Sequence, residues 1–169
     1  MHFRRNVAYF LSARKLRERF WERFSLGELN KREWEALCDG CGQCCLMRHE
    51  ESDRVTVFNV ACELLAIDKA RCKDYPNRLK KVPSCHQLTL ENVPRYHWLP
   101  KTCAYRLMHQ DKPLPAWHPL LIGNRSKMRK KGITISHYAL PSRKVPKRRM
   151  NQHIIESWSV KPERRKKQA

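Results

Sequence analysis

The sequence predicts a small α+β domain, mostly helical, with a short two-stranded antiparallel ribbon and irregular loops around a cysteine-rich metal site. A chain of 169 residues with 41% apolar residues is long enough for one modest core. Helical spacing of apolar residues recurs in separate short stretches, and prolines interrupt the middle of the chain. Four of the eight cysteines lie between positions 38 and 45. This density indicates thiols that bind a metal.

Two helices are predicted before the cysteine run. From Ser12 to Phe24, apolar residues recur at intervals of three and four, with arginines and lysines opposite. In the second helix, Asn30 is expected to be the N-cap and Glu33 to complete a capping box. We expect this helix to continue directly into Cys38.

The middle of the chain predicts one short strand and one helix. Val55 to Phe58 is typical of a strand, and Asn59 is expected to cap a helix that runs through Ile67. Cys62 would then lie in the first turn of that helix. Pro76, Pro83, Pro94 and Pro100 break the chain afterwards, which places Cys72 and Cys85 in loops or short elements.

Two further elements are expected near the C-terminal end. Thr102 to His109 is typical of a helix, with Cys103 at its start. Ile133 to Leu140 is apolar and β-branched, and it predicts a second strand antiparallel to the strand at residues 55–58.

Composition divides the chain into a basic arm at residues 1–19, a cysteine-cluster domain at 20–140 and a basic, partly ordered tail at 141–169. The net charge is +20, and residues 125–169 hold fifteen lysines and arginines against two acids. Such a tail favours an anionic partner, either a nucleic acid or an acidic protein, although many basic tails are simply solvated. Only Tyr138 and Trp158 are interleaved with these charges, too few to indicate a base-stacking platform.

We expect a cytoplasmic protein without a transmembrane segment. No run approaches the roughly 18 apolar residues of a membrane span. The apolar stretch from Val7 to Leu11 is shorter than the h-region of a secretory signal. Because the cytoplasm keeps thiols reduced, metal binding is favoured over a disulfide framework.

The spacing of the cysteine run suits metal binding. Cys38 and Cys41, and likewise Cys41 and Cys44, are separated by two residues, which lets two thiolates turn toward one ion. Gly40 and Gly42 suit the positive φ angles of such turns. The residues Asp39 and Gln43 are expected at the surface of the turn.

The adjacent residues Cys44 and Cys45 bear on how many metal sites the cysteines can form. Their Cα atoms are about 3.8 Å apart, closer than the roughly 4.4–6.8 Å of most disulfides. Consecutive side chains of an extended chain point to opposite sides, which predicts two nearby sites or one polynuclear cluster. Zinc and an iron-sulfur cluster are both suited to thiolates, and each downstream cysteine could instead be a buried structural thiol. The candidate ligands are Cys38, Cys41, Cys44, Cys45, Cys62, Cys72, Cys85 and Cys103.

Histidines are the other candidates. His118, between Trp117 and Pro119, could be aimed at the site by a proline-fixed loop, or it could be a packed or capping residue. His86 follows Cys85 and could replace a thiol, or it could lie at the surface. No phosphate-binding glycine motif and no catalytic constellation beyond the metal site is visible, so enzymatic activity is left open.

The cysteine pattern resembles a known family. Cys38-x2-Cys41-x2-Cys44-Cys45, followed by Cys62, Cys72-x2-Tyr75-x2-Arg78 and Cys85, is similar to the bacterial CxxCxxCC cysteine-cluster family, described as a zinc- or iron-chelating domain. The stretches Trp34–Leu46, Thr102–Leu107 and Leu114–Leu121 look closer still to its YcgN-like subgroup. The resemblance covers about residues 20–158 and implies cysteine-ligated metal without an established reaction. Related clusters occur in flagellin lysine methylases, but no methyl-donor site is visible here.

The sequence therefore predicts a protein that binds a metal ion or an iron-sulfur cluster through cysteines. One alternative is a redox or radical-type metalloenzyme component, which requires an open coordination position and a pocket beside His118 or Tyr105. The other is a nucleic-acid-binding protein with a structural zinc site and a basic tail.

Overall fold

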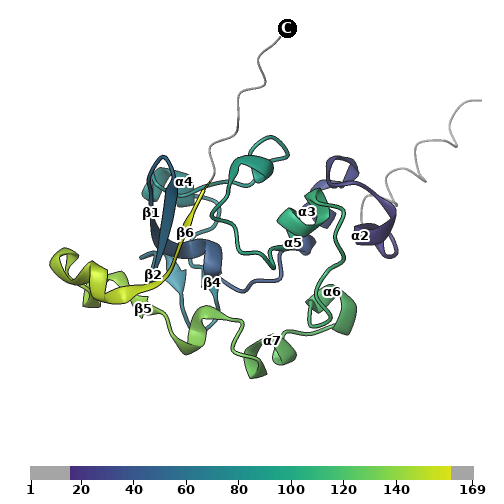
Figure 1. Ribbon diagram of the computed structural model, residues 1–169. Coiled ribbons are helices and arrows are strands. Elements are labelled where there is room, and N and C mark those ends of the chain that lie inside the picture. Colours follow the sequence, from purple (N-terminus) through teal and green to yellow (C-terminus); the bar gives the residue numbers. More distant parts are fainter. Residues whose placement is uncertain (1–15, 161–169) are drawn as a thin grey trace, which may run out of the picture. The chain divides into compact units, whose positions relative to one another are not determined.

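The computed structural model describes residues 16–160, which form short helices and strands (Figure 1). The chain divides into two compact units, and the sequence crosses between them more than once. Of the described residues, unit 1 holds 16–39 and 88–128, and unit 2 holds 40–87 and 129–160. The α+β class predicted from the sequence is confirmed.

Unit 1 is built from short helices and the loops between them. In chain order these are α2 (Phe20–Arg23), the 3₁₀ helix η1 (Leu26–Glu28), α3 (Lys31–Leu37), the 3₁₀ helix η3 (Val93–Arg95), α5 (Ala104–His109) and α6 (Pro119–Ile122). Helix α7 (Ser126–Lys130) begins in unit 1 and ends in unit 2. Helix α5 packs beside η1 and η3. Phe20, Leu37, Leu99 and Met128 are almost completely buried and form part of the apolar interior.

The start of α3 confirms the predicted capping box. The Oδ1 atom of Asn30 accepts hydrogen bonds from the backbone amides of Arg32 and Glu33 at 3.0 and 3.1 Å. In return, Oε2 of Glu33 accepts one from the Asn30 amide at 3.1 Å. These bonds satisfy donors that the first turn of a helix leaves unpaired. The helix ends at Leu37, with Cys38 as its C-cap, as the sequence predicts.

The helix predicted at residues 12–24 lies partly outside the described residues, and the described part is mostly not helical. Only Phe20–Arg23 forms helix, because Arg19 has a φ of 46° in the left-handed region. Before this break, the amide and the guanidinium of Arg17 are both bonded to Glu33. The guanidinium of Arg17 also lies 3.5 Å from the centre of the Phe24 ring. These contacts hold the segment in a turn.

Unit 2 contains a four-stranded sheet around a long central strand, and Figure 1 shows three of its strands side by side. The central strand β2 (Arg54–Ala61) pairs antiparallel with β1 (Leu46–Glu50) on one side. On the other side it pairs antiparallel with β6 (Ile154–Ser159) and then parallel with the short β5 (Leu140–Pro141).

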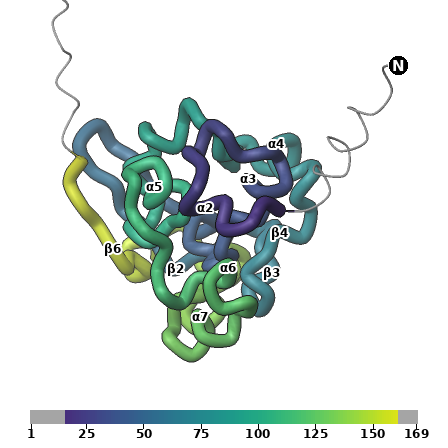
Figure 2. The backbone as a smooth tube through the Cα atoms, turned by 90° about the vertical axis from the view of Figure 1, so that its right-hand side faces the viewer, coloured from purple at the N-terminus to yellow at the C-terminus, as the bar shows by residue number. Residues whose placement is uncertain are grey.

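A separate antiparallel ribbon joins β3 (Leu65–Ala66) to β4 (Arg71–Cys72), and Figure 2 shows these two strands side by side. The remaining elements of unit 2 are short helices: η2 (Gln43–Cys45), α4 (Arg78–Lys81), η4 (Ile135–His137), η5 (Ser142–Lys144) and η6 (Lys147–His153). The predicted short antiparallel ribbon is therefore present, but it is made by other residues than those predicted.

The helix predicted to start at Asn59 is wrong, because β2 continues through Ala61. Val60 and Ala61 are fully buried and pair with β5. The side chain of Asn59 does not cap a helix: its Nδ2 donates to the Tyr138 carbonyl at 3.3 Å, and its Oδ1 lies 3.0 Å from Nδ1 of His153. Cys62 consequently follows a strand and is not in the first turn of a helix.

The strand predicted from Ile133 to Leu140 is also wrong in extent and direction. Residues 135–137 form η4, and only Leu140 and Pro141 pair with β2, in parallel. Ile135 is completely buried in a core with Leu46, Ala61, Leu65 and Ala70. Its apolar character therefore reflects burial at a turn.

None of the helices in residues 16–160 combines the length and the apolar character that crossing a bilayer requires. Most helices in this described part of the chain are one to two turns long, so tertiary packing must supply most of their stability.

Candidate functional site

The cysteine run begins where α3 ends and turns twice at glycine. Gly40 and Gly42 have φ angles of 72° and 79°, which confirms the conformations expected from the sequence. The turn at Gly42 leads into η2, and its carbonyl accepts a hydrogen bond from the Cys45 amide at 3.0 Å. Asp39 was expected at the surface, but only 4% of it is exposed.

A second segment of unit 2 holds this run in place. The amide of Ile135 donates to the Cys41 carbonyl at 3.0 Å, and Nε2 of Gln43 donates to the Ile133 carbonyl at 3.1 Å. Gln43 was expected to be a surface residue of the turn, and it instead ties the cysteine run to residue 133. Sequence reasoning missed both contacts, because nothing local relates residues about ninety positions apart.

The doublet of Cys44 and Cys45 brings two sulfur atoms close together. Their Sγ atoms are 4.0 Å apart, with Cys44 exposed and Cys45 half-buried. In a tetrahedral site with bonds of about 2.3 Å, two sulfur ligands are roughly 3.8 Å apart. The distance therefore suits two ligands of one ion, so the doublet does not by itself require two separate sites.

Three more cysteines lie in the same neighbourhood of unit 2. The Cys62 amide donates to the Cys45 carbonyl at 2.9 Å, and the Leu65 amide donates to the Cys62 carbonyl at 2.9 Å. Leu65 is in turn paired with Cys72 across the β3–β4 ribbon. Burial raises the pKa of Cys62, and the negative charges of Cys85 and Cys72 raise it further. This last effect requires Cys72 and Cys85 each to lie within electrostatic reach of Cys62.

The other three cysteines have different surroundings. Cys41 is buried, and its charge contributes, after burial, to raising the pKa of Tyr138 to about 12. Cys38 and Cys103 belong to unit 1, where Cys38 is exposed and Cys103 is the half-buried N-cap residue of α5. The helix start predicted at Cys103 is confirmed. All eight cysteines are present as thiols.

The side chains that could bind a metal are not arranged as a complete site. Within residues 16–160, no three or more His, Cys, Asp or Glu side chains are arranged so that they could hold a metal ion. The donor chemistry nevertheless fits a thiophilic metal, since the thiols of Cys44, Cys45, Cys62, Cys72 and Cys85 come together in one unit. With the buried Cys41, unit 2 holds six of the eight candidate ligands, and their sulfurs are not drawn to one point.

His118 has a capping role. Its Nδ1 accepts the Leu120 amide at 3.1 Å, and its Nε2 lies 3.2 Å from the Leu37 carbonyl. The ring is completely buried, and burial lowers its pKa. Both ring nitrogens are therefore engaged with the backbone, which is the capping alternative considered from the sequence.

Tyr105 and His86 were the other side chains considered from the sequence. The Tyr105 hydroxyl donates to the Trp34 carbonyl at 2.7 Å, so it is also engaged with the backbone. His86 is exposed, beside the half-buried Cys85. A groove lies on the β1–β2–β6 sheet of unit 2, with a volume of about 460 Å³.

Comparison with known proteins identifies the family. The chain is 47% identical over 128 residues to a UPF0260 protein of Klebsiella pneumoniae, which covers 75% of this chain and 86% of that protein. It is 45% identical over 144 residues to the UPF0260 protein YcgN of Salmonella paratyphi B, covering 83% and 93% of the two chains. The chain belongs to the UPF0260 family.

The UPF0260 assignment confirms the YcgN-like resemblance seen in the sequence. The YcgN protein of Salmonella newport is likewise 45% identical over 144 residues. No family model matches the chain, and no solved structure matches it. The names of these UPF0260 proteins state no activity and no ligand, so the function must be argued from the residues described above.

Proposed function

We propose that this UPF0260 protein is a cytoplasmic protein that binds a metal ion or an iron-sulfur cluster through cysteine thiols. One observation carries the proposal. In unit 2, backbone hydrogen bonds and the β3–β4 ribbon link the stretches that carry Cys44–Cys45, Cys62 and Cys72, and Cys85 lies within electrostatic reach of Cys62. An ordinary core has no need for five thiols in one neighbourhood.

The chemistry of this neighbourhood supports a thiophilic metal. Thiolates bind zinc and the irons of iron-sulfur clusters, and both are expected in a reducing compartment.

Metal binding and protonation must compete at Cys62. Because burial and the neighbouring thiols raise its pKa, this group is a neutral thiol at neutral pH. A metal binds only the thiolate, so binding releases this proton and the affinity for metal rises with pH. The site would therefore be coupled to folding and to pH, as thiolate sites in small proteins generally are.

The test is anaerobic purification followed by visible spectroscopy and elemental analysis. Brown protein with iron and acid-labile sulfide would support a cluster, and colourless protein with stoichiometric zinc would support a structural ion. Protein that is fully folded without iron or zinc, and that takes up neither on addition, would contradict the proposal.

Serine variants test which cysteines share the site. Cys62→Ser, Cys72→Ser and Cys85→Ser are expected to lower the bound metal per protein strongly. The matched control is Cys103→Ser, because Cys103 lies in unit 1 and begins α5 without a side-chain cap bond. If Cys103→Ser released metal to the same extent, the grouping would be wrong even though the metal binding would stand.

A further inference from the structure

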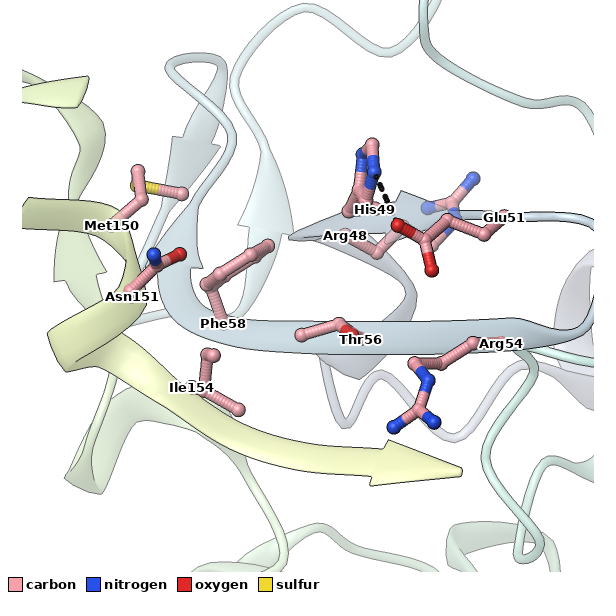
Figure 3. Close-up of a pocket in the computed structure, with 9 residues that line it drawn as sticks. All are labelled: Arg48, His49, Glu51, Arg54, Thr56, Phe58, Met150, Asn151 and Ile154. Carbon is pink, nitrogen blue, oxygen red and sulfur yellow. Dashed lines mark ion pairs between the residues drawn. The ribbon is translucent and has the colours of Figure 1, made fainter. Parts of the chain in front are cut away.

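A groove on the exposed face of the large sheet combines cationic and apolar side chains (Figure 3). Arg54, Thr56 and Phe58 alternate along β2 and therefore share this face. Their neighbours across the sheet are His49, opposite Thr56, and Ile154, opposite Phe58. The groove has a volume of about 460 Å³, within the range of about 300–1,000 Å³ typical of sites for small ligands.

Arg54 supplies the charge at one end of the groove. Its side chain is exposed, and within residues 16–160 it forms no ion pair. The other charges there are already matched: Arg48 is 2.7 Å from Glu50, and His49 is 3.4 Å from Glu51. The groove thus offers a ligand one arginine whose charge is not already paired.

The other end is apolar and carries rings. Ile154 is 45% exposed, and Figure 3 shows it beside the ring of Phe58, which is buried and only 8% exposed. The ring of His49 on β1 is 68% exposed on the same face. The sequence has too few aromatic residues near the basic tail to predict a base-stacking surface. In the folded protein, the rings of His49 on β1 and Phe58 on β2 both line the groove.

Basic residues directly precede two residues of η6, Met150 and Asn151, that line the groove. Helix η6 forms part of its wall and begins with Lys147, Arg148 and Arg149, all exposed. This helix is fixed to the sheet by the contact of His153 with Asn59 at 3.0 Å. From residue 129 to residue 160 there are eight lysines and arginines and a single acid, Glu156.

The geometry points to single-stranded nucleic acid as the ligand of this groove. An unpaired base would lie over Ile154, Phe58 and His49, its phosphate would contact Arg54, and the following phosphates would run along the start of η6. Apolar and ring surfaces next to a basic track are the usual features of proteins that bind single strands. An acidic peptide would satisfy the arginines but would leave the exposed His49 ring and the apolar surface of Ile154 without a flat partner, so it is the less favoured occupant. The inference is independent of the proposed metal function.

The experiment measures fluorescence anisotropy of a labelled 12-nucleotide single-stranded RNA with the full-length protein and the metal it is purified with. Binding is expected to weaken as salt rises, since single strands lose about 0.7 in log–log slope per neutralised phosphate. Arg54→Ala should reduce the affinity about threefold to tenfold and reduce that slope by about 0.7. The matched control, Arg71→Ala on β4, removes the same charge from an exposed position outside the groove and should change the affinity less than about twofold.

Two further variants separate the stacking and charge effects. Ile154→Ser removes apolar surface from an exposed position, so it should weaken RNA binding while leaving the salt slope unchanged. Glu51→Gln removes the acid that lines the groove and should strengthen binding about twofold to threefold. Both positions are exposed, so these proteins are expected to fold normally.

Several outcomes would overturn the inference. Equal affinities for Arg54→Ala and Arg71→Ala would remove the groove from the binding site. So would binding that disappears on deletion of residues 161–169 while the groove variants bind normally. If uridine monophosphate bound as tightly as the 12-mer, or if a 12-residue polyglutamate bound more tightly in an Arg54-dependent way, the ligand would not be a nucleic-acid strand.

Discussion

The ring of His118 is bonded to the last residue of α3, since its Nε2 lies 3.2 Å from the Leu37 carbonyl oxygen. Its Nδ1 accepts the Leu120 amide, so Nε2 carries the proton and donates to Leu37. Leu37 immediately precedes Cys38. A buried neutral histidine therefore satisfies the carbonyl at the end of α3, directly before the cysteine run begins.

Replacing His118 by alanine should destabilise the protein by about 2–3 kcal/mol, because it removes an N-cap and leaves a buried carbonyl unpaired. His118→Asn should cost less, since the amide can still cap α6 although it cannot reach Leu37. Urea unfolding followed by circular dichroism measures both losses. The control is His97→Ala at an exposed position, expected within about 0.5 kcal/mol of the parent. A loss for His118→Ala no larger than this would show that the bridge contributes nothing.

The same residue predicts a dependence of stability on pH. Burial lowers the pKa of His118 from its usual 6.5, so the unfolded chain takes up a proton more readily than the folded one. This contribution to stability is complete above about pH 6.5 and is lost as pH falls through the lower pKa of the folded state. The pKa of His86 is lowered too, so both residues act with the same sign.

The measurement is the free energy of unfolding at pH 7.5 and at pH 5.5, in the parent and in His118→Asn. Stability should be lower at pH 5.5 in the parent, and the difference should be smaller in the variant, which lacks the titrating ring. An identical difference in the two proteins would rule out His118 as a source of the effect.

The ion pair between Arg17 and Glu33 predicts a second loss of stability at lower pH. The Arg17 guanidinium and the amides of Arg17 and Asn30 hold the pKa of the buried Glu33 carboxyl at about 2, below its usual 4.5. This stability is complete above about pH 4.5 and is lost as pH falls toward 2. Glu33→Gln should cost about 1–2 kcal/mol at pH 7, a value reduced because a third of the Arg17 side chain is exposed to solvent.

The control for Glu33 is Glu22→Gln, which breaks the exposed pair with Arg19 and should cost less than about 0.5 kcal/mol. Unfolding in urea at pH 7 and at pH 3 compares the variants. Glu33→Gln should lose less stability between these two pH values than the parent does. An equal loss would mean that the carboxyl titrates normally in the folded protein.

Local rules predicted the elements that depend on neighbouring residues. The capping box at Asn30 and Glu33, the helix start at Cys103 and the left-handed glycines 40 and 42 all follow from a few residues of sequence. These features are stabilised within one or two turns of chain, so their signals are local.

Elements that depend on distant pairing could not be found in the same way. Strand β6 pairs with β2 across about a hundred residues, and its own sequence has one apolar patch amid basic clusters. Asn59 is a common helix cap, but the carbonyl of Tyr138 and the ring of His153 use its side chain instead. Local helix-capping propensity is overridden where a side chain forms hydrogen bonds with residues that are distant in the sequence.

In the candidate metal site, too, local features could be predicted from the sequence and long-range features could not. The spacing of the cysteines predicted the kind of ligand, and the identity of the thiols that share a neighbourhood needed the structure. Cys72 comes near Cys62 because β4 pairs with β3, and those strands are two residues long. Such short strands leave almost no periodic signal in a sequence.

Gly42 is the position where a single methyl group should disturb the cysteine run most. Its φ is +79°, and an added Cβ would lie 2.6 Å from Cγ1 of Ile135, a completely buried residue. Gly42→Ala should therefore cost about 3 kcal/mol, combining backbone strain and overpacking. The matched control is Gly132→Ala, where φ is +67° but no atom lies within 4 Å of the new Cβ, so only the strain of about 1 kcal/mol is expected.

Unfolding free energies compare the two variants, and the rate at which a thiol reagent labels them reports whether the cysteine run has moved. Because Ile135 also bonds the Cys41 carbonyl, Gly42→Ala should raise the labelling rate and Gly132→Ala should not. Equal destabilisation and equal labelling in the two variants would show that contact with Ile135 does not hold the run in place.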